Sequence, residues 1–169
     1  MAVGLWIPTG ALARSHDVVA DLRRTVADAY LTTSCDPESF FVADTRTIGG
    51  WLNDRAAHLY CAWDLALWDD VDGPEVERVF GIQPERGAFA IGSHVDGADA
   101  ERTLAVVAAR LAEQTGGVVN LFHALLEAAE LPGRAALVRT GNGDMREDTV
   151  LDAVAMRAWS NHPRCWMRP

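Results

Sequence analysis

Apolar and polar residues follow their clearest pattern between residues 88 and 121. A β-prone run over residues 88–94 precedes a helical stripe of apolar side chains, and a second apolar run occupies residues 118–122. The stripe repeats every three or four residues, at Leu104, Val107, Ala108, Leu111 and Ala112. The pattern predicts a βαβ unit over residues 88–121. Because such crossovers are right-handed in nearly all proteins, the two strands are expected to run parallel to each other.

The ends of this central helix carry recognisable signals. Asp96 or Asp99 is predicted to cap its start, since a short acidic side chain can accept a hydrogen bond from the first free backbone N–H groups. Gly116 and Gly117 supply the left-handed stop that often ends a helix.

The N-terminal part of the chain predicts a strand and a helix. An apolar run over residues 2–7 ends at a Pro-Thr-Gly turn, which is typical of a strand. An amphipathic helix follows, with Ser15 predicted as its N-cap. Residues 40–48 are rich in β-prone side chains and predict a second strand, ended by a pair of glycines.

Residues 51–68 are the hardest segment to interpret. Their apolar residues follow a helical stripe, so we predict a helix, on which Asp54 and His58 would form a surface pair one turn apart. Pro74 is expected at the first position of a further short helix that reaches Phe80.

The C-terminal part predicts a hairpin between two helices. A short helix is expected over residues 124–131. Residues 135–139 and 145–151 flank a Gly-Asn-Gly-Asp sequence, which is typical of a tight β-hairpin. Asp152 is then expected to cap a last helix over residues 153–159.

Together these elements predict a single α+β domain over residues 1–169. We expect a mixed sheet of four or five strands with helices mainly on one face, and the βαβ unit at 88–121 makes this arrangement ferredoxin-like. The length of 169 residues suits one domain, and 49% hydrophobic residues can fill its core.

The net charge of the chain limits the kinds of macromolecule that it is expected to bind. The formal net charge is −9, and all 15 basic residues are arginine. An acidic chain lacks the positive surface that phosphate backbones require, so nucleic acid is not an expected partner. The same field would attract a basic protein over a long range.

The cysteines and apolar runs predict a cytoplasmic protein. Cys35, Cys61 and Cys165 are far apart and show neither zinc-ligand spacing nor a disulfide pattern, which is typical of a reducing compartment. Cys35 has no adjacent base that would activate it. The first residues lack the basic region of a signal peptide, and no apolar run reaches the ~20 residues that span a bilayer.

The chain resembles an uncharacterised bacterial family known only as a domain of unknown function. The resemblance is carried by residues 3–6, residues 104–120 ending in Gly-Gly-Val-Val-Asn, residues 150–153, Ala158-Trp159, His162-Pro163 and Met167. It implies a compact α+β domain without an established activity. Similar βαβ units occur in immunity proteins that neutralise toxins. Where the family often has Asp-His this chain has Ala100 and Glu101, and where it tends to have Asp this chain has Asn120.

The best candidate for chemistry is a pair of histidines. His94 and His123 each follow one strand of the βαβ unit, and the carboxyl ends of such strands commonly bind ligands. With Asp96 nearby, the two imidazoles could hold a metal or serve as acid and base. If another strand lies between them, their backbones would be about 10 Å apart, which suits flanking a small ligand better than chelating one ion.

A second candidate surface combines acidic residues and tryptophans. Aligning the acidic turn at residues 69–73 with a calcium-binding loop places Trp68 and Val79 at ligand positions, so this turn is not an EF-hand. No metal site and no cofactor are expected. The tryptophans beside breaks and charges are candidate anchors for a partner. The predicted binding residues are Trp51, Trp68, Asp69, Asp70, Asp72 and Trp166.

These patterns leave three functions open. The leading one is a cytoplasmic acidic binding module that engages a basic protein, such as a toxin that it neutralises. The alternative is a small enzyme or small-molecule binder that uses the strand ends near His94 and His123. The third is a subunit that works as a homodimer.

Overall fold

The computed structural model describes residues 2–26, 39–42, 44–50, 57–66, 73–140 and 146–165. Its strands are β1 (Ala2–Trp6), β2 (Ser39–Val42), β3 (Ala57–Asp64), β4 (Ala88–Ser93), β5 (Val118–Asn120), β6 (Ala135–Thr140) and β7 (Arg146–Leu151). Its α-helices are α1 (Leu12–Val26), α2 (Gly73–Phe80), α3 (Ala98–Thr115) and α4 (Ala153–Ser160), and two 3-10 helices, η1 (Thr45–Ile48) and η3 (Leu126–Glu130), complete the described elements.

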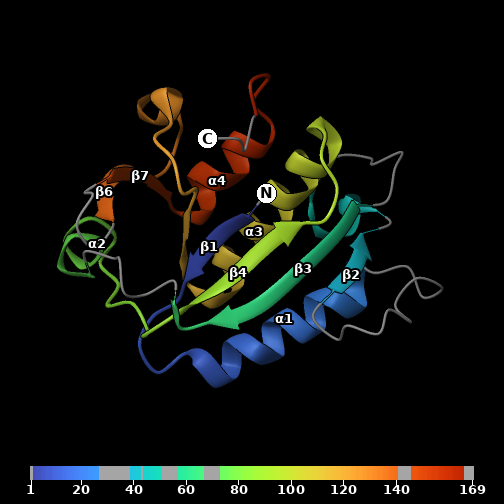
Figure 1. Ribbon diagram of the computed structural model, residues 1–169, viewed down its shortest axis with the longest axis horizontal. Helices are drawn as coiled ribbons and strands as arrows, with labels where there is room; N and C mark the ends of the chain where they lie inside the picture. The colour runs from blue at the N-terminus through green and yellow to red at the C-terminus, as the bar shows by residue number, and fades with distance from the viewer. Residues whose placement is uncertain are drawn as a thin grey trace.

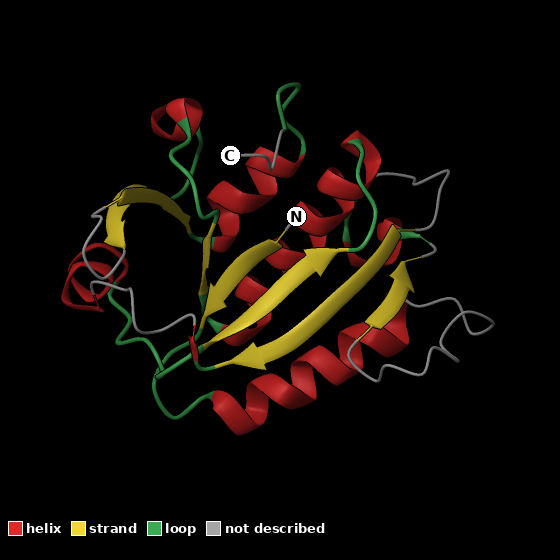
Figure 2. Cartoon of the chain, in the orientation of Figure 1, coloured by secondary structure: helices red, strands yellow, loops and turns green. Residues whose placement is uncertain are grey.

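The strands form one sheet in the order β2-β3-β4-β1-β5-β7-β6, shown in Figures 1 and 2. Every neighbouring pair is antiparallel. The α+β class is therefore confirmed, but the prediction of a mixed sheet with four or five strands is wrong. Strand β3, which the sequence predicted as part of a helix, and the hairpin of β6 and β7 enlarge the sheet beyond the ferredoxin-like expectation.

The βαβ unit is present in a split form. β4 and β5 are parallel to each other because β1 lies between them and is antiparallel to both. α3 connects them behind β1 and β4 in the view of Figure 1. Gly116 ends α3 in the left-handed conformation, as predicted (φ 72°). The prediction of an acidic N-cap is wrong, since Gly97 occupies that position without a side-chain hydrogen bond.

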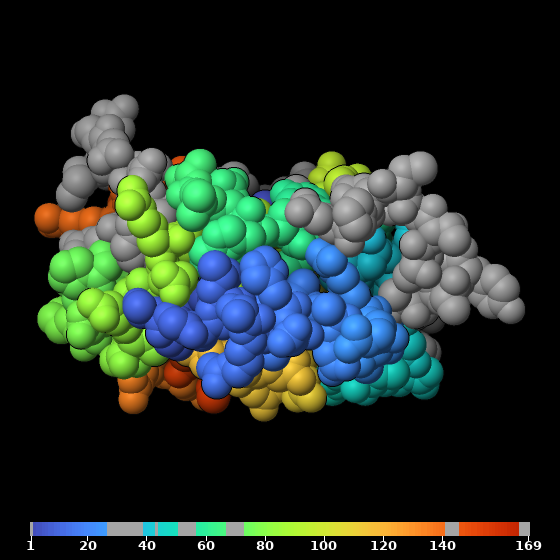
Figure 3. Space-filling view, turned by 90° about the horizontal axis from the view of Figure 1, so that it is seen from below, coloured from blue at the N-terminus to red at the C-terminus, as the bar shows by residue number. Residues whose placement is uncertain are grey.

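The main core lies between the sheet and helices α1, α3 and α4; we call this side the helix face. Alternate residues of the strands point into it, among them Leu5, Leu59 and Ile91, and all three are fully buried. α3 is covered so completely that twelve of its residues are buried. α1 forms much of the surface seen in Figure 3. It begins at Leu12, so Ser15 lies inside the helix and the prediction of Ser15 as N-cap is wrong.

α2 packs on the opposite side of the sheet, which we call the open face. Its Val76 and Phe80 meet Trp6 in a second, smaller core that also contains Ala88, Val118, Val138 and Val150. This core covers the end of the sheet where β4 begins and β1 ends. Of the described helices, α2 alone contributes to a core on this face.

Residues 51–68 include the largest error of the sequence interpretation. Residues 57–64 form strand β3 in the middle of one half of the sheet, and the helix predicted there is absent from the described part of this segment. The buried residues Ala57, Leu59 and Cys61 alternate with half-buried ones, which is the period of a strand. His58 therefore lies on a strand, and Asp54 falls outside the described residues.

The remaining local predictions have mixed outcomes. The hairpin is confirmed as β6 and β7 in antiparallel register, although its turn lies outside the described residues. Asp152 caps α4, with Oδ1 accepting a hydrogen bond from the backbone N of Ala155 at 2.8 Å. The strand predicted over residues 40–48 is shorter, since residues 45–48 form η1, and the predicted helix over residues 124–131 is the 3-10 helix η3.

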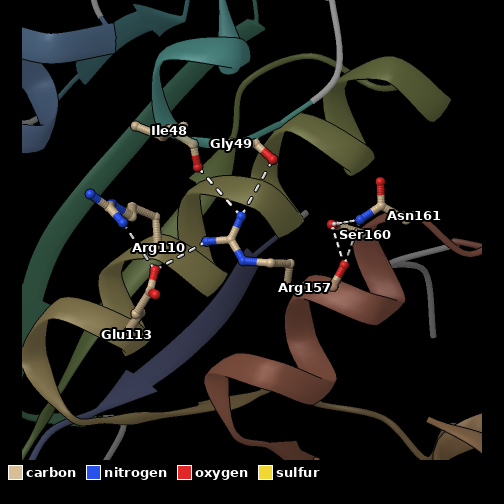
Figure 4. A network of polar contacts seen from close by, with 7 residues as sticks. All are labelled: Ile48, Gly49, Arg110, Glu113, Arg157, Ser160 and Asn161. Atoms are coloured by element: carbon tan, nitrogen blue, oxygen red, sulfur yellow. Dashed lines mark hydrogen bonds and ion pairs between the residues drawn. The ribbon is translucent and has the colours of Figure 1, made fainter. Parts of the chain in front are cut away.

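Arg157, near the C-terminus, connects three elements of the helix face through hydrogen bonds (Figure 4). Arg157 of α4 donates from Nη2 to Glu113 of α3 at 3.2 Å, and from Nη1 to the carbonyl oxygens of Ile48 and Gly49 at 3.4 Å each. Glu113 also accepts from Arg110 at 3.0 Å. The planar fork of donors lets one side chain bridge α3, α4 and η1, which a lysine could not do.

Candidate ligand site on the open face

The predicted partner-binding residues cannot be placed. Trp51, Trp68, Asp69, Asp70, Asp72 and Trp166 all lie outside the described residues, as does Cys35. The prediction that they form a binding surface therefore stays a prediction.

The predicted histidine pair is brought to one edge of the sheet but not together. β4 and β5 end at the same edge with β1 between them, as the split arrangement requires. His123 there turns back on its own loop, with Nδ1 2.8 Å from the carbonyl oxygen of Leu121. Among the described contacts, none joins His123 to His94. The acid–base role of these two residues stays a prediction.

His94 instead joins a group of rings from β2 and β3 on the open face. We call Phe41, His58, Tyr60 and His94 the ring cluster. The register explains the gathering, because Phe41 pairs with His58 across β2 and β3, and the backbone N of His94 donates to the carbonyl oxygen of His58 at 2.9 Å. Alternation along β3 then places Tyr60 on the same face as His58.

The rings of this cluster are in contact from one end to the other. Phe41 and His58 are stacked, with centroids 4.4 Å apart and planes 9° apart. The centroid of His94 lies 4.3 Å from that of His58 and 5.1 Å from that of Tyr60. His94 is exposed and the other three rings are half-buried, so the cluster presents aromatic and imidazole surface to solvent.

Tyr60 has its position because residue 92 is glycine. A Cβ atom on Gly92 would lie within 3.0 Å of three atoms of the Tyr60 side chain, closer than real Cβ contacts. The phenol therefore lies across β4, next to His94. Partial burial raises the pKa of Tyr60, which keeps its hydroxyl neutral and able to donate a hydrogen bond.

Small residues continue the open face beyond the ring cluster. Ala62 pairs with Ala90, and Ala90 pairs with Gly4, so three neighbouring strands offer a low floor at this level. Phe122 bounds it on the β5 side, since a Cβ on Gly4 would lie 3.0 Å from the ring of Phe122. The outcome is a shallow surface with ring side chains on two sides.

Phe122 is held in an unusual backbone conformation. It is the one residue other than glycine with a positive φ (59°) in the described part of the chain. Asn120 supports it by accepting a hydrogen bond from the Phe122 backbone N at 2.9 Å. Left-handed residues of this kind are found where the surrounding structure imposes them, frequently at binding sites.

Asn120 belongs to a buried polar network that the sequence did not reveal. Its Nδ2 donates to Asp148 Oδ2 at 3.3 Å, and Thr140 donates to the same oxygen at 2.8 Å. Asp148 is 1% exposed, and its other oxygen lies 3.3 Å from Nε of Arg146. An aspartate at position 120 would place a second carboxylate against Asp148, so asparagine suits this position.

Acidic side chains lie at the same edge as the ring cluster, towards the helix face. A pocket of about 400 Å³ is lined by Ala57, which precedes His58, and by the segment from Val95 to Ala100. Asp96 and Asp99 are both exposed there, at the start of α3. Within the described residues, no three histidine, cysteine or acidic side chains gather as metal ligands.

The two cysteines that are described belong to the core. Cys61 and Cys165 are buried, and burial raises the pKa of Cys165 to about 12. We expect Cys165 to resist alkylation by iodoacetamide at pH 8 in the folded protein, because only about one molecule in ten thousand carries the thiolate. Mass spectrometry of the digested protein would measure this, with protein unfolded in guanidinium as the positive control. Rapid alkylation of folded protein at Cys165 would contradict the burial.

Comparisons with known proteins give a family and no further relatives. A family model described as "Family of unknown function (DUF6368)" matches residues 2–167. No curated protein and no solved structure matches the chain. No helix in the described part of the chain has the length and apolar character needed to cross a membrane.

Proposed function

Because the chain belongs to DUF6368, a family of unknown function, we propose a function from the open face: the protein is a binding module for a basic protein segment. In this proposal the ring cluster receives an arginine side chain of the partner. The observation that carries it is the continuous contact of Phe41, His58, His94 and Tyr60 on a face that described helices cover only at the other end.

The chemistry of the ring cluster suits a guanidinium group. A planar cation stacks on aromatic faces, and such contacts contribute about 0.5 to 2 kcal/mol, depending on how far the pair is desolvated. The hydroxyl oxygen of Tyr60 can accept one of its hydrogen bonds. The chain already holds an arginine in this way on the helix face, where Arg23 lies 5.7 Å from the ring of Phe40 and donates to the carbonyl oxygen of Cys61.

Charge supports the same choice of partner. The net charge of −9 attracts a basic segment over a long range, and Asp96 and Asp99 add two exposed carboxylates at the edge beside the cluster. Electrostatic attraction of this kind mainly raises the association rate and weakens with salt. Neutralisation of a basic toxin is one role that such a module would fill, and the reducing cytoplasm is its proposed location.

Peptides of equal charge test the proposal. We expect a nine-residue peptide of alternating arginine and glycine to bind about fivefold more tightly than its lysine counterpart, as measured by calorimetry at pH 8 and low salt. Tyr60→Ala should remove most of this preference, while Tyr60→Phe, which keeps the ring, should retain much of it. His16→Ala supplies a matched control, because His16 is an exposed histidine on α1 at the helix face.

Two results would overturn this proposal. Equal affinity for the arginine and lysine peptides would exclude stacking on the rings, and unchanged affinity in Tyr60→Ala would exclude the ring cluster as the site. Variants must first match the wild-type thermal unfolding temperature, so that a lost preference reports on recognition.

A small-molecule binder at the same rings is the second candidate function. The shallow floor beside Tyr60 and the donors of His94 and Tyr60 suit a flat, uncharged ligand with a carbonyl group. Benzamide distinguishes the two: binding of benzamide that is lost in Tyr60→Ala, without any preference for the arginine peptide, favours the small molecule. Light scattering of the free protein tests the homodimer alternative directly.

A further inference from the structure

A serine and a histidine of the open face lie at hydrogen-bond distance. Ser39 is the first residue of β2, and its Oγ lies 3.2 Å from Nε2 of His94, just past the end of β4. Serine and histidine at this separation form the pair that activates a hydroxyl for nucleophilic attack. The ring cluster described above includes His94 but makes no use of Ser39.

The histidine of this pair has a defined orientation. Its backbone N is bonded to the carbonyl oxygen of His58, and its ring contacts those of His58 and Tyr60 at 4.3 and 5.1 Å. When the Ser39 hydroxyl donates to Nε2, the ring carries its own proton on Nδ1. Packing against two rings thus holds the basic nitrogen towards the serine.

The solvent exposure of Ser39 and His94 also suits a reaction at the protein surface. Ser39 is 9% exposed, so its hydroxyl is partly shielded from water, whereas His94 is exposed and can exchange protons with solvent. Because little of Ser39 is exposed, a small acyl group reaches its hydroxyl more easily than a large one. The negative charge of the chain disfavours an anionic acyl donor.

We propose that Ser39 and His94 form a nucleophile–base pair that takes an acyl group from small, uncharged carboxylic esters. Ser39 Oγ attacks the ester carbonyl carbon, and its proton passes to Nε2 of His94. The bond to the leaving alcohol then breaks, and the alkoxide receives that proton, which gives acyl-Ser39 and the free alcohol. Water then attacks the acyl carbon while Nε2 of His94 takes its proton. The bond from the acyl carbon to Ser39 Oγ breaks, His94 returns the proton to Oγ, and the carboxylic acid leaves.

This proposal is independent of arginine recognition. Peptide binding needs the faces of the rings, whereas acyl transfer needs the Ser39 hydroxyl. Ser39→Ala should leave the preference for the arginine peptide intact, so failure of one proposal is distinguishable from failure of the other.

A fluorophosphonate probe tests the pair directly. Attack by Ser39 forms an O–P bond and expels fluoride, while His94 takes the proton. We expect mass spectrometry to find the adduct on Ser39, and p-nitrophenyl acetate to release p-nitrophenolate with the full protein. General-base assistance contributes about 10²- to 10⁴-fold, so His94→Gln should slow labelling at least about a hundredfold.

The variants separate chemistry from folding. Ser39→Ala should abolish labelling, and Ser160→Ala should leave it unchanged, because the Ser160 hydroxyl donates to a carbonyl oxygen within α4. Glutamine at position 94 retains a polar side chain of similar size but cannot act as a base. Ser39 left unlabelled, labelling at another serine alone, or an unchanged rate in a folded His94→Gln variant would each overturn the proposal.

Discussion

Replacing Trp6 by alanine is expected to lower the free energy of unfolding by about 3 to 5 kcal/mol. Trp6 is fully buried and is the largest side chain of the second core, where it meets Val76 and Phe80 of α2. Removing the indole would leave a cavity between α2 and the sheet that backbone pairing of β1 with β4 and β5 prevents from closing. Urea unfolding followed by circular dichroism measures the change.

Trp6→Phe is the matched control for this prediction. The indole N–H of Trp6 is buried and has no hydrogen-bond partner in the described part of the chain. Phenylalanine therefore loses volume but no hydrogen bond, and we expect a loss below about 1.5 kcal/mol. A phenylalanine variant as unstable as the alanine variant would show that cavity formation is not the main cause.

The second large effect is expected from Gly117→Ala, at about 3 kcal/mol of lost stability. Gly117 lies between the end of α3 and β5, and a Cβ there would fall within 3.0 Å of the backbone oxygen of Trp6. Since β1 and β5 are paired at Trp6 and Val118, the oxygen cannot withdraw without breaking the ladder. Thermal and urea unfolding would both report the loss.

Gly81→Ala is the control for this prediction, because it introduces backbone strain without a steric clash. Gly81 has a positive φ of 72°, but open space surrounds the position of its Cβ. We expect it to lose about 1 kcal/mol, from the left-handed conformation alone. Equal losses in the two variants would mean that the close approach at Gly117 is relieved elsewhere.

The second core and the candidate site divide the open face between them. α2 and Trp6 occupy the end where β4 begins, and the ring cluster occupies the end where β4 stops. Trp6→Ala should therefore reduce stability without removing the preference for arginine peptides in the fraction that stays folded. The two ends can be tested separately because different residues make them.

The elements predicted best from sequence periodicity are those recognised from neighbouring residues in the chain. α3 has a continuous apolar stripe and a glycine stop, and α4 has its cap at Asp152, so both could be placed from neighbouring residues alone. β3 could not. Leu59 and Trp63 fit a helical stripe, while Leu59 and Cys61 fit an alternating strand, and a short apolar run satisfies both periods.

Most of the candidate site depends on the register between strands, which the sequence alone did not predict. His94 was singled out from the end of a predicted strand, which is a local feature. Its partners Ser39, His58 and Tyr60 come from β2 and β3, and they reach His94 only through the register of those strands. No described contact joins His94 to His123, because lying at the same edge does not bring side chains together across an intervening strand.

By itself, the sequence determined the α+β class, the βαβ unit around α3, the hairpin of β6 and β7, and the acidic charge, because these depend on composition and on spacing along a few residues. The tertiary structure decided the number of strands, the place of β1 between β4 and β5, and the face on which His58, Tyr60 and His94 meet. Strand order and register are set by contacts between residues far apart in the chain, and one residue of register exchanges the two faces of a strand.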